Sequence, residues 1–136
     1  MTEPGHRFRR DTGAASRYES CIVRYLLGPW IHDLIGRASL QLGSRVLDVA
    51  CGTGAVTRAA AVTVGPSGTV VGLDRSPEML TVARKVAGES VPTIQWELGD
   101  AANLPFADSS LDVVLCQQGL QFFAATRSKS GLSPRC

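Results

Sequence analysis

A short turn with two glycines, Gly52 and Gly54, directly follows an apolar run that begins at Arg45. A turn without bulky side chains, set between a buried strand and a helix, leaves backbone N–H groups open to an anionic or polar ligand. Asp74 lies twenty residues after Gly54, at the end of the next apolar run. This spacing suits a carboxylate that accepts hydrogen bonds from both hydroxyls of a ribose. The pattern predicts a site for a cofactor that contains a nucleoside.

The frame of this turn argues against two other nucleotide motifs. A dinucleotide fingerprint requires a third glycine, and Thr57 stands at that position. A phosphate-binding loop requires a lysine followed by serine or threonine, which the turn also lacks. What remains is the pattern Asp-x-Ala-x-Gly-x-Gly, with Asp48 four positions before the first glycine. A nicotinamide oxidoreductase is therefore disfavoured.

The elements that must position these residues alternate between strand and helix. Strands are expected at Arg45–Ala50, Thr69–Leu73, Thr93–Leu98 and Leu111–Cys116. A first helix is expected at Ser16–Leu27, where Gly28-Pro29 ends it, and a second helix begins at Pro29. A third is expected at Ala55–Val64. A fourth begins at Pro77, with Ser76 as its cap, and ends at Gly88. This order predicts an α/β fold with a parallel sheet and right-handed crossovers.

Polar residues follow each expected strand. An open α/β sheet binds its ligands beyond the carboxyl ends of the strands. Asp48 with the glycine turn, Asp74, Asp100 and Gln117 lie at those four ends, one at each. Together they predict a polar rim over an apolar sheet.

The bulk composition narrows the class of protein. The chain has 136 residues, of which 44% are hydrophobic and 19% charged, as expected for one globular domain. We expect no membrane span, because no apolar run approaches about 18 residues. The N-terminus lacks the apolar core of a signal peptide, so a cytoplasmic location is expected. The four cysteines form no CxxC pair, and neither a metal site nor a disulfide framework is expected.

The basic residues gather at the two ends of the sequence. Arg7, Arg9 and Arg10 lie near the start, and Arg127, Lys129 and Arg135 lie in residues 124–136, whereas residues 11–123 hold more acids than bases. A nucleic-acid-binding domain needs a basic stripe on its body. We therefore expect no nucleic-acid partner.

Four motifs follow one another in the sequence: Arg45–Gly54; Val71–Asp74 with Ser76–Leu80; Gly99–Phe106; and Leu111–Val114. In this order and with this spacing they resemble those of a class I S-adenosylmethionine-dependent methyltransferase. The closest subgroup is the type 11, ubiquinone/menaquinone-biosynthesis-like set, and the resemblance covers about residues 16–123. It implies an enzyme with a Rossmann-like methyltransferase fold that uses S-adenosyl-L-methionine to methylate a small-molecule acceptor.

The resemblance also implies roles for individual residues. Gly52 and Gly54 would let the backbone approach the methionine part of the cofactor. Asp48 would receive its ammonium group, directly or through water. Asp74 would accept hydrogen bonds from both ribose hydroxyls. An alternative stays open for Asp48, which would act only as a structural cap on the turn.

The other implied contacts concern the adenine and the reacting centre. Met79 would pack on the adenine ring, and it also lies on the apolar stripe of its helix. Asp100 would accept from the adenine amino group, with the Ala101 N–H at a ring nitrogen; alternatively, Asp100 only caps a turn. Gln117 would face the sulfonium and the acceptor. The remaining cofactor-contacting positions of the motifs are Ala50, Thr53 and Arg75.

No catalytic residue is identified from the sequence. The sulfonium already carries an activated methyl group, so the protein mainly needs to position the two reactants in line within a dry pocket. A base is unnecessary where the acceptor is already nucleophilic. Asp112 is interpreted as a strand-entry residue rather than a catalytic one.

The chain departs from the family after the fourth strand. The family has seven strands, with an order that begins 3-2-1-4-5, and the sequence supplies four. Residues 124–136 and residues 1–13 are expected to be unstructured tails, which leaves an incomplete methyltransferase domain at 14–123 whose C-terminal half is missing. Val113, Val114 and Leu115 would then lie on an uncovered sheet edge.

Two hypotheses about function follow from this departure. The first is an S-adenosylmethionine-dependent methyltransferase. The second is a non-catalytic remnant that binds the cofactor, or a subunit whose missing strands come from a partner or from self-association through the fourth strand.

Overall fold

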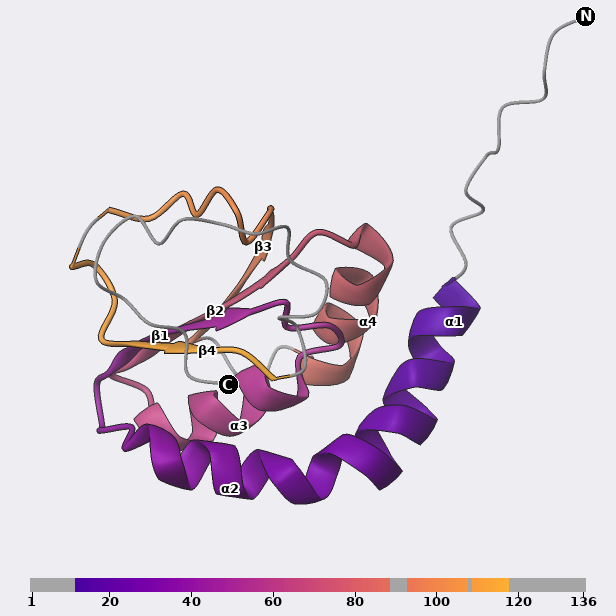
Figure 1. Ribbon diagram of the computed structural model, residues 1–136, viewed down its shortest axis with the longest axis horizontal. Helices are drawn as coiled ribbons and strands as arrows, with labels where there is room; N and C mark the ends of the chain where they lie inside the picture. The colour runs from indigo at the N-terminus through magenta and orange to yellow at the C-terminus, as the bar shows by residue number, and fades with distance from the viewer. Residues whose placement is uncertain (1–11, 89–92, 108, 118–136) are drawn as a thin grey trace, which may run out of the picture.

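A four-stranded parallel sheet forms the centre of the molecule (Figure 1). The computed structural model describes residues 12–88, 93–107 and 109–117. The strand order is β3-β2-β1-β4. The strands are β1 (Arg45–Val49), β2 (Thr69–Asp74), β3 (Ile94–Leu98) and β4 (Val113–Leu115). The expected α/β fold with a parallel sheet is confirmed, and the order matches the first four strands of the expected series.

Apolar side chains cover both faces of β1 and β2. On one face, Val46 and Val70 pack with residues of helices α2 (Gly28–Ala38) and α3 (Ala55–Val64). On the other face, Leu47 and Leu73 pack with Val114 and with the partly buried Phe106 and Leu111. A strand that is buried on both faces reads as a continuous apolar run, which is why the two central strands could be placed from the sequence.

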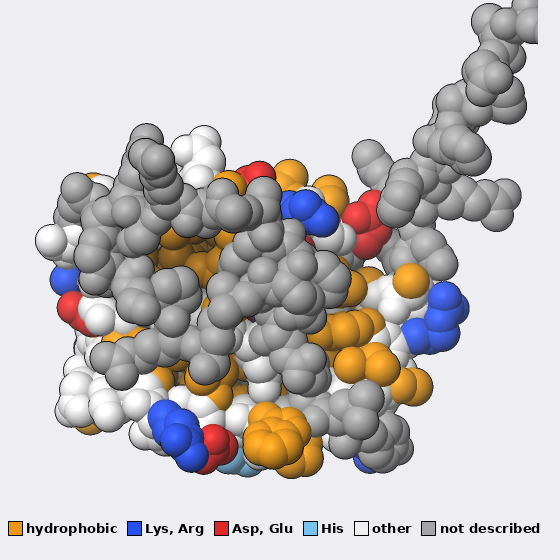
Figure 2. All heavy atoms as spheres, viewed as in Figure 1, with side chains coloured by type: hydrophobic (Ala, Val, Ile, Leu, Met, Phe, Trp, Pro, Cys, Tyr) orange, Lys and Arg blue, Asp and Glu red, His pale blue; other side chains and the backbone are white. Residues whose placement is uncertain are grey.

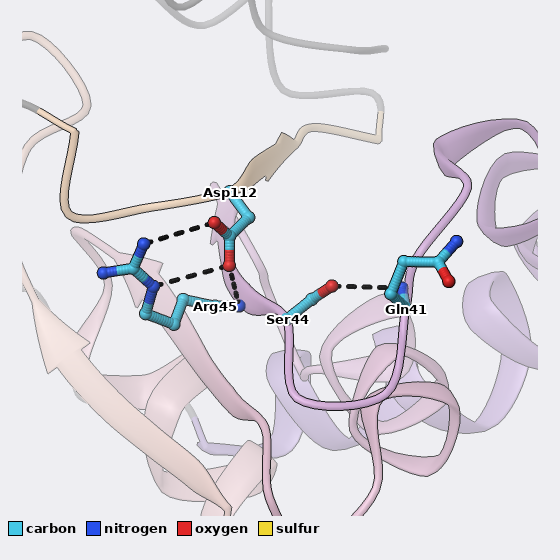
Figure 3. A network of polar contacts seen from close by, with 4 residues as sticks. All are labelled: Gln41, Ser44, Arg45 and Asp112. Carbon is cyan, nitrogen blue, oxygen red and sulfur yellow. Dashed lines mark hydrogen bonds and ion pairs between the residues drawn. The ribbon is translucent and has the colours of Figure 1, made fainter.

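The fourth strand is shorter than expected, and the residue before it, Asp112, is bound to the start of β1. The Asp112 carboxylate accepts a hydrogen bond of 2.7 Å from the Arg45 backbone N–H, and its other oxygen lies 3.2 Å from the Arg45 guanidinium (Figure 3). These hydrogen bonds and the nearby positive charge hold the pKa of Asp112 below its usual range. Asp112 thus enters the sheet at the start of β1, at the end opposite the glycine turn, and the interpretation as a strand-entry residue is confirmed.

The helices that follow β1 and β2 begin and end where the sequence predicts. Helix α3 begins directly after Gly54, and Gly65 ends it. Helix α4 (Pro77–Ala87) has Ser76 as its N-cap, whose hydroxyl accepts a hydrogen bond from the Met79 N–H, and Gly88 as its C-cap. The cap satisfies an N–H group that has no partner within the helix.

The N-terminal helices differ from the prediction of two helices separated at Gly28-Pro29. Helix α1 (Thr12–Arg17), the π-helix η1 (Tyr18–Leu27) and α2 follow one another without a break and form one curved arm (Figure 1). The Gly28 N–H donates to the carbonyl of Val23, five residues earlier. This wider register lets the chain pass Pro29, which has no N–H and would clash with the carbonyl four residues before it in an α-helix. The predicted break was therefore wrong.

Several expectations fall outside the described residues. The two expected tails correspond to residues 1–13, of which Thr12 and Gly13 lie in α1, and to residues 124–136, of which none is described. Within the described ranges, β4 pairs only with β1. No helix in those ranges is long and apolar enough to span a membrane. On the face seen in Figure 2, the basic side chains of the described residues lie in separate groups.

Candidate functional site

The glycine turn joins the end of β1 to the start of α3 through unusual backbone angles. Ala50, Gly52 and Gly54 all have positive φ, at 54°, 58° and 83°. The Cys51 N–H donates to the Leu73 carbonyl at 3.0 Å, and the Gly54 N–H donates to the Cys51 carbonyl at the same distance. Glycine adopts positive φ without the steric cost that a side chain adds, whereas Ala50 carries that cost. Such strain at a turn is typical of functional sites.

Asp74 links the ends of the first two strands. Its Oδ2 accepts a hydrogen bond of 2.9 Å from the Gly52 N–H, and its Oδ1 accepts one of 2.8 Å from the Ser76 N–H. An ionised carboxylate has about four acceptor positions, so two remain for further donors. The structure therefore brings the predicted ribose-binding carboxylate into direct contact with the predicted glycine turn.

Asp48 is buried below the turn, with 1% of its surface exposed. The Thr57 hydroxyl, on α3, donates to its Oδ2 at 2.6 Å. Burial is the main cause that raises the pKa of Asp48 from 3.8 to about 7, with the negative charge of Asp74 adding to the rise and the Thr57 hydrogen bond opposing it. The carboxyl group thus ties strand β1 to helix α3, and its charge changes near neutral pH.

This pKa predicts a pH dependence of stability. The pKa of Asp48 is higher in the folded chain than in the unfolded chain, so the folded chain binds the proton of this carboxyl group more tightly. The stability linked to this proton is fully present below about pH 4, and it is lost as the pH rises to about 7. Wild type should lose about 1.4 kcal/mol per pH unit in that window relative to Asp48→Asn, which carries no titratable group. Urea unfolding of both proteins at intervals from pH 5 to pH 8 measures this difference, and parallel profiles would contradict it.

Trp96, which the sequence analysis did not assign to the site, forms the floor beside the turn. It stands opposite Gly72 in the pairing of β2 with β3. A Cβ atom on Gly54 would lie 2.4 Å from the indole ring, and one on Gly72 would lie 2.8 Å from it. The ring therefore occupies space that only glycine leaves open at both positions. A glycine inside a strand marks a close approach of this kind, but it does not say which residue approaches.

The remaining predicted site residues follow the carboxyl ends of β2, β3 and β4, and no side-chain hydrogen bond among the described residues joins them to Asp48 or Asp74. Asp100 is exposed, and its Oδ1 accepts a hydrogen bond of 2.9 Å from the Ala102 N–H. This is the turn-capping alternative of the sequence analysis, and it leaves the predicted adenine contact untested. Met79 is half-buried in the first turn of α4, Gln117 is half-buried after β4, Ala101 packs against the core and Arg75 is exposed.

The arm contacts the turn and the start of α3 through residues that the sequence did not indicate. The Glu19 side chain, on η1, accepts hydrogen bonds from the Thr53 hydroxyl and from Arg58. Arg58 also donates to the Thr53 carbonyl at 2.7 Å. Tyr18 lies over Gly52, and burial raises its pKa, helped by the charges of Asp74 and Glu19. The partners are far apart in sequence, so no local pattern indicates them.

Metal and thiol chemistry find little support in the described part of the chain. It holds no group of three or more His, Cys, Asp or Glu side chains suited to a metal ion. Burial, with Asp48 and Asp74 nearby, raises the pKa of the Cys51 thiol. A raised pKa lowers the thiolate fraction, which disfavours a reactive thiol at Cys51.

The sheet order, with the glycine turn and Asp74 at its carboxyl edge, is that of a Rossmann-like fold. Residues 46–133 match the model of the methyltransferase domain family, and the chain belongs to that family. This confirms the resemblance to class I S-adenosylmethionine-dependent methyltransferases.

Known relatives agree with this assignment. The demethylmenaquinone methyltransferase of Lactobacillus johnsonii is 40% identical over 94 residues, which cover 68% of this chain and 38% of that protein. A Methanococcus maripaludis protein assigned to the S-adenosyl-L-methionine-dependent methyltransferases superposes with a TM-score of 0.71 at 23% identity, over 91% of this chain and 57% of that one. A methyltransferase from Aquifex aeolicus gives a TM-score of 0.65 at 22% identity, over 78% and 56%. The chain thus spans well under half the length of the Lactobacillus relative.

Proposed function

We propose that this chain binds S-adenosyl-L-methionine along the carboxyl edge of its sheet and transfers the methyl group to a small-molecule acceptor. The observation that carries the proposal is the hydrogen bond from the Gly52 N–H to Asp74, which joins the glycine turn to the expected ribose-binding carboxylate. Family membership supports the same cofactor.

The residues of the site fit this cofactor. The Asp74 carboxylate keeps acceptor positions for two hydroxyl groups beyond the two N–H donors that it already holds. Asp48, buried under the turn, would be favoured in its ionised form by an ammonium group nearby. Met79 follows β2, Asp100 and Ala101 follow β3, and Gln117 follows β4. These four residues are proposed to contact the adenine and the reacting end of the cofactor. The proposed contacts also include Ala50 and Thr53, in the glycine turn, and Arg75, next to Asp74.

The chemistry asks the protein for position rather than for acid or base groups. The cofactor would supply a methyl group bound to a sulfonium, and the neutral thioether that remains after transfer is a good leaving group. The chain's own contribution is to fix the turn and Asp74 against each other, so that the bound molecule has one orientation, and to exclude water. No described residue is assigned a proton-transfer role.

For the acceptor, we propose a small molecule of the demethylmenaquinone kind. The support is the name of the Lactobacillus relative, of which this chain covers 38%. A transfer assay with S-adenosylmethionine labelled on its methyl group and reduced demethylmenaquinone tests it. Label in the quinone fraction is expected from wild type and absent from Asp74→Ala. Cofactor binding without transfer would contradict the enzymatic part of the proposal.

A second candidate function is a cofactor-binding subunit completed by a partner or by a second copy. The observation that favours it is the position of β4, which pairs only with β1 in the described ranges. An unpaired strand edge can accept a further strand. Light scattering coupled to size-exclusion chromatography distinguishes the two, because a monomer of 14.4 kDa counts against strand completion by a second copy.

A further inference from the structure

We propose that Glu19 is a positioning residue of the cofactor site: it fastens the N-terminal arm to the glycine turn, so that arm and turn act as one binding unit. This inference rests on the proposed cofactor binding, since the unit matters for a ligand that lies on the turn. Among the described residues, no hydrogen bond joins Glu19 to Asp48 or Asp74, so Glu19 acts on the site through the turn.

The contacts of Glu19 form a closed network of three residues. One oxygen accepts from the Thr53 hydroxyl, and the other accepts from the Arg58 guanidinium at 2.7 Å. The second arm of that guanidinium donates to the Thr53 carbonyl at 2.7 Å. The side chains of Arg58 and Glu19 are 24% and 19% exposed, so solvent screens this ion pair only in part.

The network acts on the most deformable part of the turn. Thr53 stands between Gly52 and Gly54, whose backbones lack the restriction that a side chain imposes. Both the hydroxyl and the carbonyl of Thr53 are held, so the flanking peptide groups have a fixed direction. The preceding peptide group, Cys51–Gly52, carries the Gly52 N–H that bonds to Asp74. Glu19 therefore restrains the turn at the residue that follows the donor to Asp74.

The same helix places an aromatic ring over the turn. The Tyr18 ring lies 3.6 Å from where a Cβ on Gly52 would stand. Tyr18 and Glu19 are consecutive residues at the start of the π-helix, and a π-register is frequent at functional sites. Holding Glu19 thus also holds the ring that covers this side of the turn.

The ion pair lies beside a groove between the arm and α3. A groove of about 530 Å³ lies between η1, α2 and α3, lined in part by Glu19, Arg58, Val23 and Ile31. The Glu19 network bridges the two elements at the groove's edge next to the glycine turn.

The test compares Glu19→Ala with Asp33→Ala. Asp33 forms an ion pair with Arg37 on the same arm, at 2.8 Å and well exposed, and it serves as the matched control. Hydrogen exchange without ligand should show amides of residues 52–58 exchanging at least about tenfold faster in Glu19→Ala and unchanged in Asp33→Ala. Calorimetry should show S-adenosylhomocysteine binding weakened about tenfold in Glu19→Ala alone.

The outcomes separate this inference from the proposed function. If wild type does not bind S-adenosylhomocysteine, the proposed function fails, and the exchange data alone decide whether Glu19 fastens the turn. If wild type binds and Glu19→Ala matches it in affinity and exchange, the inference is overturned. If Glu19→Ala does not fold, Glu19→Gln takes its place, because glutamine keeps the shape of the side chain without its charge. If the exchange rates and the affinity of Glu19→Gln equal those of wild type, the inference is overturned.

Discussion

Asp74→Ala is expected to weaken S-adenosylhomocysteine binding by at least about 100-fold. Two hydrogen bonds from ribose hydroxyls to a charged acceptor contribute about 3–6 kcal/mol together, and about 1.4 kcal/mol corresponds to a factor of ten. The substitution also removes the acceptor of the Gly52 and Ser76 N–H groups, which loosens the turn. Isothermal titration calorimetry measures the change.

The comparison needs two further variants. Asp74→Asn keeps one carbonyl oxygen for a hydroxyl donor, so an intermediate loss of about tenfold is expected. Asp33→Ala removes an exposed carboxylate that belongs to an ion pair on α2, and its affinity should equal that of wild type. Equal affinity of Asp74→Ala and wild type would show that the ribose lies elsewhere.

Gly54→Ala is expected to destabilise the fold by about 2–5 kcal/mol. Its positive φ of 83° adds the strain of a left-handed alanine, about 1–2 kcal/mol. The new methyl group would also lie 2.4 Å from the Trp96 ring, and forcing extra atoms into a packed site costs about 1–3 kcal/mol. Urea unfolding followed by circular dichroism measures the free energy of unfolding.

Three other glycines separate these two costs. Gly88 has positive φ but nothing within 4 Å of a Cβ, so its alanine variant reports the backbone strain alone. Gly72 has ordinary φ but meets Trp96 at 2.8 Å, so its variant reports the steric cost. Gly36 has neither, and Gly36→Ala in α2 should stabilise the protein by about 0.5–1 kcal/mol.

Replacing the ring tests the steric explanation directly. In the double variant Gly54→Ala/Trp96→Leu, the new methyl group no longer meets an indole ring. Its loss of unfolding free energy should therefore be smaller than the sum of the losses in the two single variants. Strict additivity of the two substitutions would contradict the role given to Trp96.

The central elements could be predicted because local signals and tertiary structure agree there. The apolar runs at β1 and β2, the glycine turn, and the Ser76-Pro77 cap each favour one conformation, and the sheet requires the same one. The contact between the turn and Asp74 follows from this, because neighbouring parallel strands end at the same edge.

The features that the sequence did not reveal depend on contacts between distant residues. Glu19 meets Thr53 and Arg58 across 34 and 39 residues, and no periodicity records such a pair. The passage through Gly28-Pro29 needs the π-register, whereas a proline after a glycine ordinarily marks a break. Trp96 fits the alternation of a strand, so its packing on Gly54 and Gly72 became visible only when the register of β3 was known.

The central claim, that this chain forms a working cofactor site, is tested most directly by calorimetric titration of the purified wild-type chain with S-adenosylhomocysteine. Circular dichroism beforehand establishes that the chain is folded. We expect saturable binding with a stoichiometry of about one, because the proposed site consists of one glycine turn and the one carboxylate, Asp74, that is bound to it. A folded chain that gives no binding heat at millimolar ligand would contradict the claim.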